Sequence, residues 1–130
     1  MQKAISNSEE DYLEAILVLS EKNEGVRVTD IASTLGFSKP SVNKAIKNLK
    51  ERGLVTQEAY GPVYLTFSGE CVAKNVKTRH LVLRSFLTDI LGVDEAKAEE
   101  EACAIEHSIS IDTIERLSIL LNKLKELKNF

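Results

Sequence analysis

Carboxylate, thiol and imidazole side chains occur in this sequence at helical spacing. Asp11 and Glu14 stand three positions apart, and Cys103, Glu106 and His107 form an i, i+3, i+4 set. Residues three and four apart share one face of a helix, so each set can bring its polar atoms together. Thiolate, imidazole and carboxylate suit a transition metal, and the carboxylates move the preference towards manganese or ferrous iron. Solvated Glu–His pairs and a Cys that is only a small hydrophobic residue show the same spacing, so both interpretations stay open.

Helices predominate among the elements that must position these residues. Apolar periodicity predicts helices over about 8–22, 30–35, 38–52, 66–91 and 94–107, and a last one after Ser110. Short strands are expected at 26–28, 54–57 and 63–66, with a turn at 59–62. Capping residues are expected at Ser6 or Ser8, Thr29 and Ser38. Along the fifth helix, Ala98, Ala102 and Ile105 form one apolar stripe.

The order of elements between residues 29 and 66 is that of a winged helix-turn-helix: a short helix, a tight turn at Gly36, a longer helix and a hairpin. The formal net charge of −3 argues against nucleic acid, but residues 38–53 hold five basic residues against Glu51 alone. A locally basic helix in an acidic chain can still bind DNA. A solvated basic face is the alternative for this helix taken by itself.

The first turns of the longer helix should enter the major groove. The exposed candidates for DNA binding are Ser38, Lys39, Pro40, Ser41, Asn43, Lys44 and Lys47. Ser41 and Asn43 suit base edges, and the lysines suit phosphates. No Lys or Arg lies between Leu54 and Thr66, so phosphate contacts of the wing would have to come from its backbone or from Tyr60.

Composition excludes several other classes of protein. The 130 residues are 43% hydrophobic and 28% charged, which is ordinary for a globular protein. The sequence shows no secretion signal and no apolar run approaching ~20 residues, so we expect a cytoplasmic protein without a structural disulfide. It shows no nucleophile–base pair and no Gly-rich phosphate loop, so we expect no enzyme.

Several segments resemble the diphtheria toxin repressor and manganese transport regulator family, and their spacing is kept over nearly the whole chain. The segments are 10–16, 28–32, 38–42, 65–69, 79–80 and 101–107. The resemblance implies a metal-dependent transcriptional repressor that binds operator DNA as a homodimer when loaded with Mn(II) or Fe(II). It implies a mainly α fold, in which a winged helix-turn-helix DNA-binding domain (1–70) precedes a helical metal-binding and dimerisation domain (71–130).

By motif match, the resemblance carries over six metal ligands: Asp11, Glu14, His80, Cys103, Glu106 and His107. Asp11 follows the manganese branch of the family and Cys103 the iron branch, so the set is a hybrid in which manganese is slightly favoured. Arg84 occupies a position that is acidic in both branches, which puts a second metal position in doubt, although Glu99 and Glu101 could contribute to one. The sequence ends at Phe130, so it resembles the short form without an SH3-like domain.

The sequence leaves three rivals to this hypothesis. The main one is a metal-independent winged-helix regulator that senses oxidation through Cys103 or Cys71. A small metalloenzyme is the second, and a purely structural helical dimer is the third. The basic helix at 38–52 argues against the structural dimer, and the ligand set offers the metalloenzyme no obvious catalytic base.

Overall fold

The computed structural model describes residues 4–128 of the chain, mostly as helices. The chain divides into two compact units, Met1–Lys74 and Asn75–Phe130. Within residues 4–128, no helix has both the length and the apolar character that a membrane span requires. The fold class is mainly α with one small sheet, which confirms the class predicted from the sequence.

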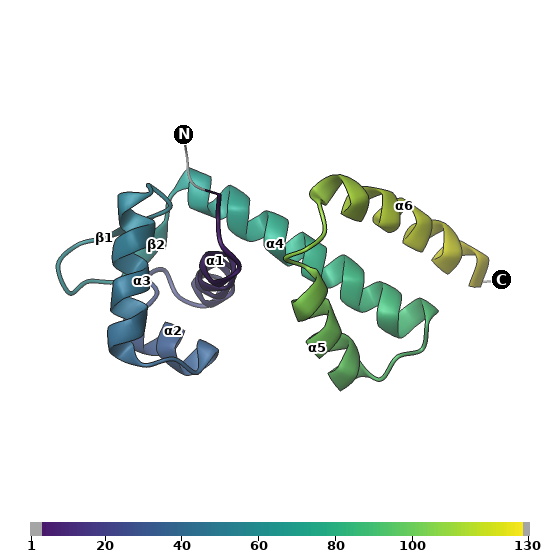
Figure 1. The fold of residues 1–130 in the computed structure, drawn as a ribbon, viewed down its shortest axis with the longest axis horizontal. Helices are drawn as coiled ribbons and strands as arrows, with labels where there is room; N and C mark the ends of the chain where they lie inside the picture. Colours follow the sequence, from purple (N-terminus) through teal and green to yellow (C-terminus); the bar gives the residue numbers. More distant parts are fainter. Residues whose placement is uncertain (1–3, 129–130) are drawn as a thin grey trace. The chain divides into compact units, whose positions relative to one another are not determined.

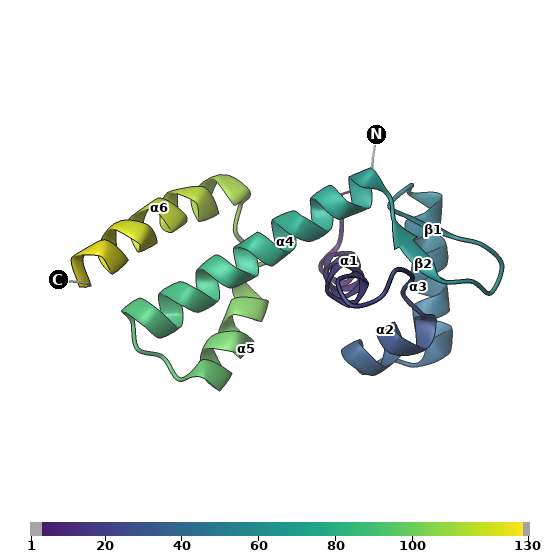
Figure 2. The same cartoon turned by 180° about the vertical axis from the view of Figure 1, so that it is seen from behind.

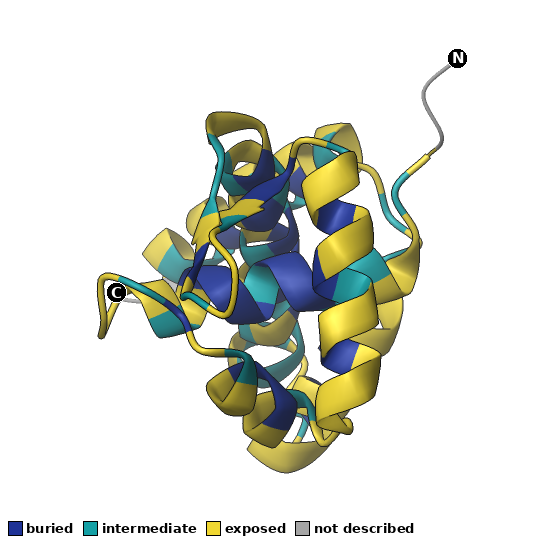
Figure 3. Ribbon diagram, turned by 90° about the vertical axis from the view of Figure 1, so that its left-hand side faces the viewer, coloured by how far each residue is buried: buried dark blue, intermediate teal, exposed yellow. Residues whose placement is uncertain are grey.

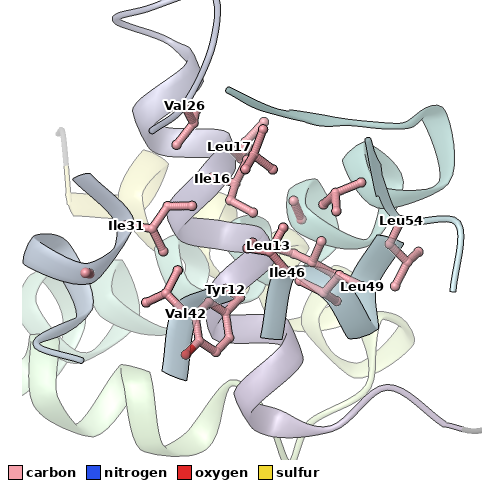
Figure 4. Packing of buried hydrophobic residues seen from close by; sticks show 14 residues of the cluster. Tyr12, Leu13, Ile16, Leu17, Val26, Ile31, Val42, Ile46, Leu49 and Leu54 are labelled. Atoms are coloured by element: carbon pink, nitrogen blue, oxygen red, sulfur yellow. The ribbon is translucent and has the colours of Figure 1, made fainter. Parts of the chain in front are cut away.

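The first unit is a winged helix-turn-helix. It contains α1 (Asn7–Ser20), α2 (Val28–Leu35), α3 (Lys39–Glu51), β1 (Val55–Gln57), β2 (Val63–Leu65) and the start of α4 (Phe67–Ser85). Helix α1 packs against α2, α3 and β2, and its buried face supplies much of the core (Figures 1, 2 and 4). That core includes Leu13, Ile16, Ile31, Ile46 and Leu49, each almost fully removed from solvent.

Local sequence explains where α1 begins. The hydroxyl of Ser6 accepts a hydrogen bond from the Glu9 backbone N–H, and the Glu9 carboxylate accepts one from the Ser6 N–H, which makes a capping box. Of the two serines expected as caps, Ser6 is therefore the one used. The Glu9 carboxylate also pairs with Arg52 at 2.6 Å, which fastens the start of α1 to the end of α3.

The start of α2 differs from the prediction. The sequence predicts a cap at Thr29, but the helix begins at Val28 with Arg27 at the N-cap and no side-chain cap hydrogen bond. The reason is a tertiary one. Val26 forms an antiparallel bridge with Val63, so the extended chain ends there and the next residues already turn. Gly36, with φ of 72°, ends α2 in the left-handed conformation that glycine adopts easily.

Helix α3 follows the prediction closely. Ser38 caps it through the Ser41 N–H, and Pro40 lies in its first turn, where no intrahelical N–H partner is lost. Val42, Ile46 and Leu49 are buried along one stripe. The opposite face is open to solvent, as Figure 3 shows for the side of the molecule on which α3 lies.

The wing is the antiparallel pair β1–β2, in which Thr56 stands opposite Tyr64. Its position against α4 depends on Gly69. A Cβ atom at Gly69 would lie 1.9 Å from the backbone oxygen of Leu54, so only glycine allows α4 to approach the strand this closely.

The second unit packs helices α5 (Glu95–Ile105) and α6 (Ile111–Lys128) with the C-terminal part of α4 (Figures 1 and 2). Leu83, Ala102 and Ile114 form its buried core. The long helix predicted over 66–91 ends differently. Its last turn, Phe86–Ile90, is π-helical, and the Leu91 N–H donates to the Phe86 carbonyl.

The apolar stripe predicted for α5 is correct only in part. Ala98 and Ala102 are fully buried, whereas Ile105 is 38% exposed. Ile105 is the last residue of the helix, and at this end the described neighbours cover the apolar face only partly.

Candidate metal centre and nucleic-acid interface

Three of the predicted metal ligands meet inside the second unit. His80 lies on α4, Cys103 lies on α5, and Glu106 is the C-cap residue that follows α5. One ligand atom from each lies within 4.8 Å of the other two. The Nδ1 atom of His80 is 2.8 Å from a Glu106 carboxylate oxygen and 3.7 Å from the Cys103 sulfur. A thiol, an imidazole and a carboxylate therefore converge on one point.

His80 is held between two carboxylates. Its Nδ1 atom faces Glu106, and its Nε2 atom lies 2.9 Å from a carboxylate oxygen of Glu99. The hydrogen bond to Glu106 is the largest influence on the imidazole, and with Glu99 it outweighs burial and raises the pKa of His80 to about 9. Without a metal ion, the proton on His80 therefore takes the place of a cation between the two carboxylates.

A hydrogen bond of Arg79 and the small buried residues of α5 help to bring these groups together. The guanidinium of Arg79, next to His80 on α4, donates to the Glu106 backbone oxygen at 2.6 Å. The buried residues of α5, Ala98 and Ala102, are small, so the helix can lie close to its neighbours. The Glu106 side chain is only 1% exposed, and a buried carboxylate needs a hydrogen-bonded or cationic partner.

Glu99 contacts His80, a pairing that the sequence does not predict. The sequence indicates Glu99 only as a contributor to a second metal position, yet it lies against the Nε2 atom of His80 and 3.6 Å from Arg84. Its spacing of four residues before Cys103 places both on one face of α5, which was the available signal. A metal-binding imidazole usually donates its other N–H to a carboxylate, and Glu99 is placed to accept that hydrogen bond.

The other predicted ligands are distributed over both units. The Nε2 atom of His107 lies 3.7 Å from a Glu106 carboxylate oxygen in the second unit. Asp11 and Glu14 lie on α1 of the first unit, three residues apart, and both are partly buried. Cys71 is exposed on α4.

The donor set of the second unit fits a transition metal. Such ions are bound by nitrogen, oxygen and sulfur at about 2.0–2.3 Å, so ligand atoms on one ion lie at most about 4.6 Å apart. The distances from His80 Nδ1 to the Glu106 oxygen and to the Cys103 sulfur, 2.8 Å and 3.7 Å, fall within that limit. The exposed thiol of Cys103 leaves the cluster accessible from solvent.

The nucleic-acid interface expected on α3 is an exposed surface. All seven candidate residues are exposed, namely Ser38, Lys39, Pro40, Ser41, Asn43, Lys44 and Lys47. The Ser38 hydroxyl donates to the Ser41 hydroxyl at 2.9 Å, so both hydroxyls are positioned at the helix start. Helix N-terminal turns of this kind contact base edges when a recognition helix enters the major groove.

A winged helix-turn-helix with an exposed basic helix, followed by a helical unit that clusters thiol, imidazole and carboxylate, defines a DNA-binding regulator with a metal-binding lobe. The chain belongs to the iron dependent repressor family. The model of its N-terminal DNA binding domain matches residues 4–63, and that of its metal binding and dimerisation domain matches residues 66–127. The protein is thus a transcriptional regulator rather than an enzyme, and the family does not favour the oxidation-sensing alternative.

Individual relatives agree with the family. An uncharacterized HTH-type transcriptional regulator of Methanocaldococcus jannaschii is 38% identical over 123 residues, covering 94% of this chain and 98% of the relative. The HTH-type transcriptional regulator MntR of Bacillus subtilis is 36% identical over 119 residues, covering 92% and 83%. A manganese-dependent transcriptional repressor solved in complex with manganese matches with a TM-score of 0.80 and 31% identity. The match covers 88% of this chain and 52% of that one, so this chain spans about half of its length.

Proposed function

We propose that this protein is a cytoplasmic repressor of metal-ion homeostasis that binds operator DNA as a homodimer when loaded with Mn(II) or Fe(II). The observation that carries the proposal is the convergence of His80, Cys103 and Glu106 within 4.8 Å in the second unit. In this proposal, residues 1–70 bind DNA and residues 71–130 bind metal and dimerise.

The proposed ligand set joins residues of both units. His80, Cys103, Glu106 and His107 come from the second unit, and Asp11 and Glu14 come from α1 of the first. Manganese is slightly favoured because the α1 carboxylates supply hard oxygen, and the relatives named for manganese support that preference. The Cys103 thiolate is a softer donor, which keeps ferrous iron in the proposal.

A bound divalent cation would supply two positive charges to a cluster of carboxylates that otherwise repel one another. The proton shared by His80 Nδ1 and Glu106 would be lost when the cation binds. Glu99 would keep the imidazole ring oriented by accepting a hydrogen bond from the Nε2–H of His80. With Asp11 and Glu14 engaged, the position of α1 would be tied to the second unit. Tying the first unit to the second would set the distance between the two recognition helices of a dimer. That distance must match the spacing of two DNA half-sites, about one helical turn.

The DNA contacts of the proposal come from the exposed face of α3. All six residues are exposed; Ser41 and Asn43 would contact base edges, Lys39, Lys44 and Lys47 would contact phosphates, and Pro40 would contact a thymine methyl group. Neutralising the carboxylates with metal would also favour approach to a polyanion.

The proposal is tested by metal-dependent DNA binding. Binding sites are first selected from randomised DNA in two separate experiments, one with Mn(II) and one with chelator. Fluorescence anisotropy then compares Mn(II), Fe(II) under anaerobic conditions, Co(II), Zn(II) and chelator, for the wild type and for His107→Ala. We expect tight binding only with metal, and a much higher metal requirement for His107→Ala. Ser108→Ala, an exposed neighbour, is the matched control. Equal affinity in chelator and in metal would contradict the proposal.

A further inference from the structure

Helix α1 carries two pairs of residues on opposite sides. Asp11 and Glu14, which α1 contributes to the proposed ligand set, stand three positions apart, and so do Glu9 and Tyr12. Residues three apart share a helix face, and at about 100° per residue the two pairs point away from each other. Glu9 contacts the end of α3, and Tyr12 contacts the turn before α3. The helix that contributes metal ligands in the proposed function therefore also holds the helix proposed to read DNA.

The contact at the end of α3 is an ion pair. One guanidinium nitrogen of Arg52 lies 2.7 Å and 2.6 Å from the two carboxylate oxygens of Glu9. Only 23% of the Arg52 side chain and 20% of the Glu9 side chain are exposed, so solvent screens this pair less than it screens a surface pair. The Glu9 carboxylate also accepts the hydrogen bond from the Ser6 N–H in the capping box, which fixes it at the first turn of α1. The ion pair thus joins a fixed point on α1 to the C-cap of α3.

The contact at the start of α3 is an aromatic pair. The rings of Tyr12 and Phe37 lie 5.8 Å apart between centroids, with an interplanar angle of 45°. Tilted rings at this separation attract each other. Tyr12 is buried in the core, whereas Phe37 is half-exposed and directly precedes Ser38, the N-cap of α3. The contact therefore holds the turn in which α3 begins to the residue that follows Asp11.

Apolar packing defines the orientation of α3 on α1 less strictly than these two contacts do. The buried side chains of the two helices, such as Ile16, Ile46 and Leu49, are aliphatic (Figure 4), and hydrophobic burial is non-directional. A cleft of about 470 Å³ also lies between the start of α1 and the second half of α3. Glu9 and Arg52 both line this cleft, so their ion pair bridges the helices where close apolar packing is interrupted.

We infer that the Glu9–Arg52 and Tyr12–Phe37 contacts transmit metal binding at α1 to α3, with Arg52 and Phe37 as positioning residues. The inference rests on the proposed function and specifies how its metal and DNA sites communicate. Coupling between sites is carried by packed side chains and ion pairs, and here such contacts fasten both ends of α3 to α1. Loss of either contact would keep the metal ligands and the exposed face of α3, but would release one end of α3 from α1.

The experiment measures a coupling factor, which is the DNA dissociation constant in chelator divided by that in saturating Mn(II). Anisotropy of the full chain on the selected DNA gives both constants at one salt concentration. Arg52→Gln and Phe37→Ala should each lower the coupling factor about fivefold. The DNA affinity in chelator and the Mn(II) affinity without DNA should keep their wild-type values. Arg52→Lys, which preserves the ion pair, should retain the wild-type coupling factor. Lys22→Gln, which removes one positive charge at an exposed position of the first unit, should retain it too.

The coupling factor separates a positioning role from a direct DNA contact. A contact with DNA that does not depend on metal would weaken binding equally in Mn(II) and in chelator, and the factor would stay constant. An unchanged coupling factor in either Arg52→Gln or Phe37→Ala, with metal-dependent binding by the wild type, would overturn the inference and leave the proposed function standing. A wild type with equal DNA affinity in chelator and in Mn(II) would overturn both.

Discussion

The Nδ1 atom of His80 lies 2.8 Å from a carboxylate oxygen of Glu106, in a buried contact that joins α4 to the end of α5. The same nitrogen faces the Cys103 sulfur at 3.7 Å. Two of the groups proposed to bind a divalent cation, His80 and Glu106, therefore already share a proton, and the second unit assembles its own part of the site. The stability of the second unit should therefore depend on pH, its metal preference on the donor atom of Cys103, and the number of metal ions it binds on the charges around Glu99.

The apo protein should lose stability as the pH rises through the pKa of His80. Glu106 and Glu99 raise that pKa from 6.5 to about 9, so the folded state holds the proton more tightly than the unfolded state does. This stabilisation is complete below about pH 6.5 and disappears as the pH approaches 9. Urea denaturation in chelator between pH 6 and 9.5 should show a falling free energy of unfolding. His80→Gln should flatten the decline over this range, and a wild-type stability that rises from pH 7 to 9 would refute the assignment.

The donor atom at Cys103 should set the metal preference. Replacing the thiolate with a carboxylate in Cys103→Glu removes the only soft ligand of the proposed set, so affinity for Zn(II) and Co(II) should fall relative to Mn(II). Competition titrations measure the affinities for Zn(II) and Co(II) relative to the affinity for Mn(II). The Co(II)-loaded wild type should also show sulfur-to-metal charge-transfer absorption that Cys103→Ser lacks. Cys71→Ser is the control, since Cys71 is exposed on α4 and outside the cluster. An unchanged spectrum in Cys103→Ser would show that this thiol is not a ligand.

The cation of Arg84 should limit the number of metal ions bound. Its guanidinium lies 3.6 Å from Glu99, where it supplies positive charge next to His80. Arg84→Glu exchanges that charge for a further oxygen donor, so the ratio of Mn(II) to protein at saturation should rise from one to two. Equilibrium dialysis with elemental analysis measures the ratio. Arg116→Glu, an exposed position on α6, controls for the change in net charge. A ratio of two Mn(II) ions per chain in the wild type would contradict the prediction that Arg84 blocks a second metal position.

Gly69 should be essential for the stability of the first unit. An added Cβ would lie 1.9 Å from the Leu54 backbone oxygen. Relieving this clash requires a shift of the backbone of α4 or of Leu54, because no flexible side chain lies at the point of contact. Gly69→Ala should lower the free energy of unfolding by about 2–4 kcal/mol, measured by chemical denaturation. Ser68→Ala, at an exposed neighbouring position, should change it little. Equal stabilities of Gly69→Ala and the wild type would show that α4 approaches the strand less closely.

Much of the first unit could be predicted because its signals are local. The stripe of Val42, Ile46 and Leu49 and the cap at Ser38 lie within one helix, and spacing alone defines them. The start of α2 could not be predicted in the same way. Its first residue is set by the bridge between Val26 and Val63, two residues that are distant in sequence.

In the candidate metal site too, the sequence predicts the local arrangement but not the contacts between helices. The i, i+3, i+4 spacing of Cys103, Glu106 and His107 was visible in the sequence, and the structure brings Glu106 close to both of the others. The pairing of Glu99 with His80 depends on how α5 is aligned against α4. That alignment follows from packing across the second unit, so no periodicity along the chain reports it.

In the proposed function, metal binding and DNA binding are coupled, and thermodynamic linkage makes this coupling reciprocal. If Mn(II) tightens DNA binding by a given factor, the DNA must tighten Mn(II) binding by the same factor. The measurement is the Mn(II) dissociation constant by isothermal titration calorimetry, with and without saturating selected DNA, at one salt concentration and pH. We expect a lower Mn(II) dissociation constant with DNA, by the factor found in the anisotropy titrations. An identical Mn(II) dissociation constant with and without DNA would contradict it.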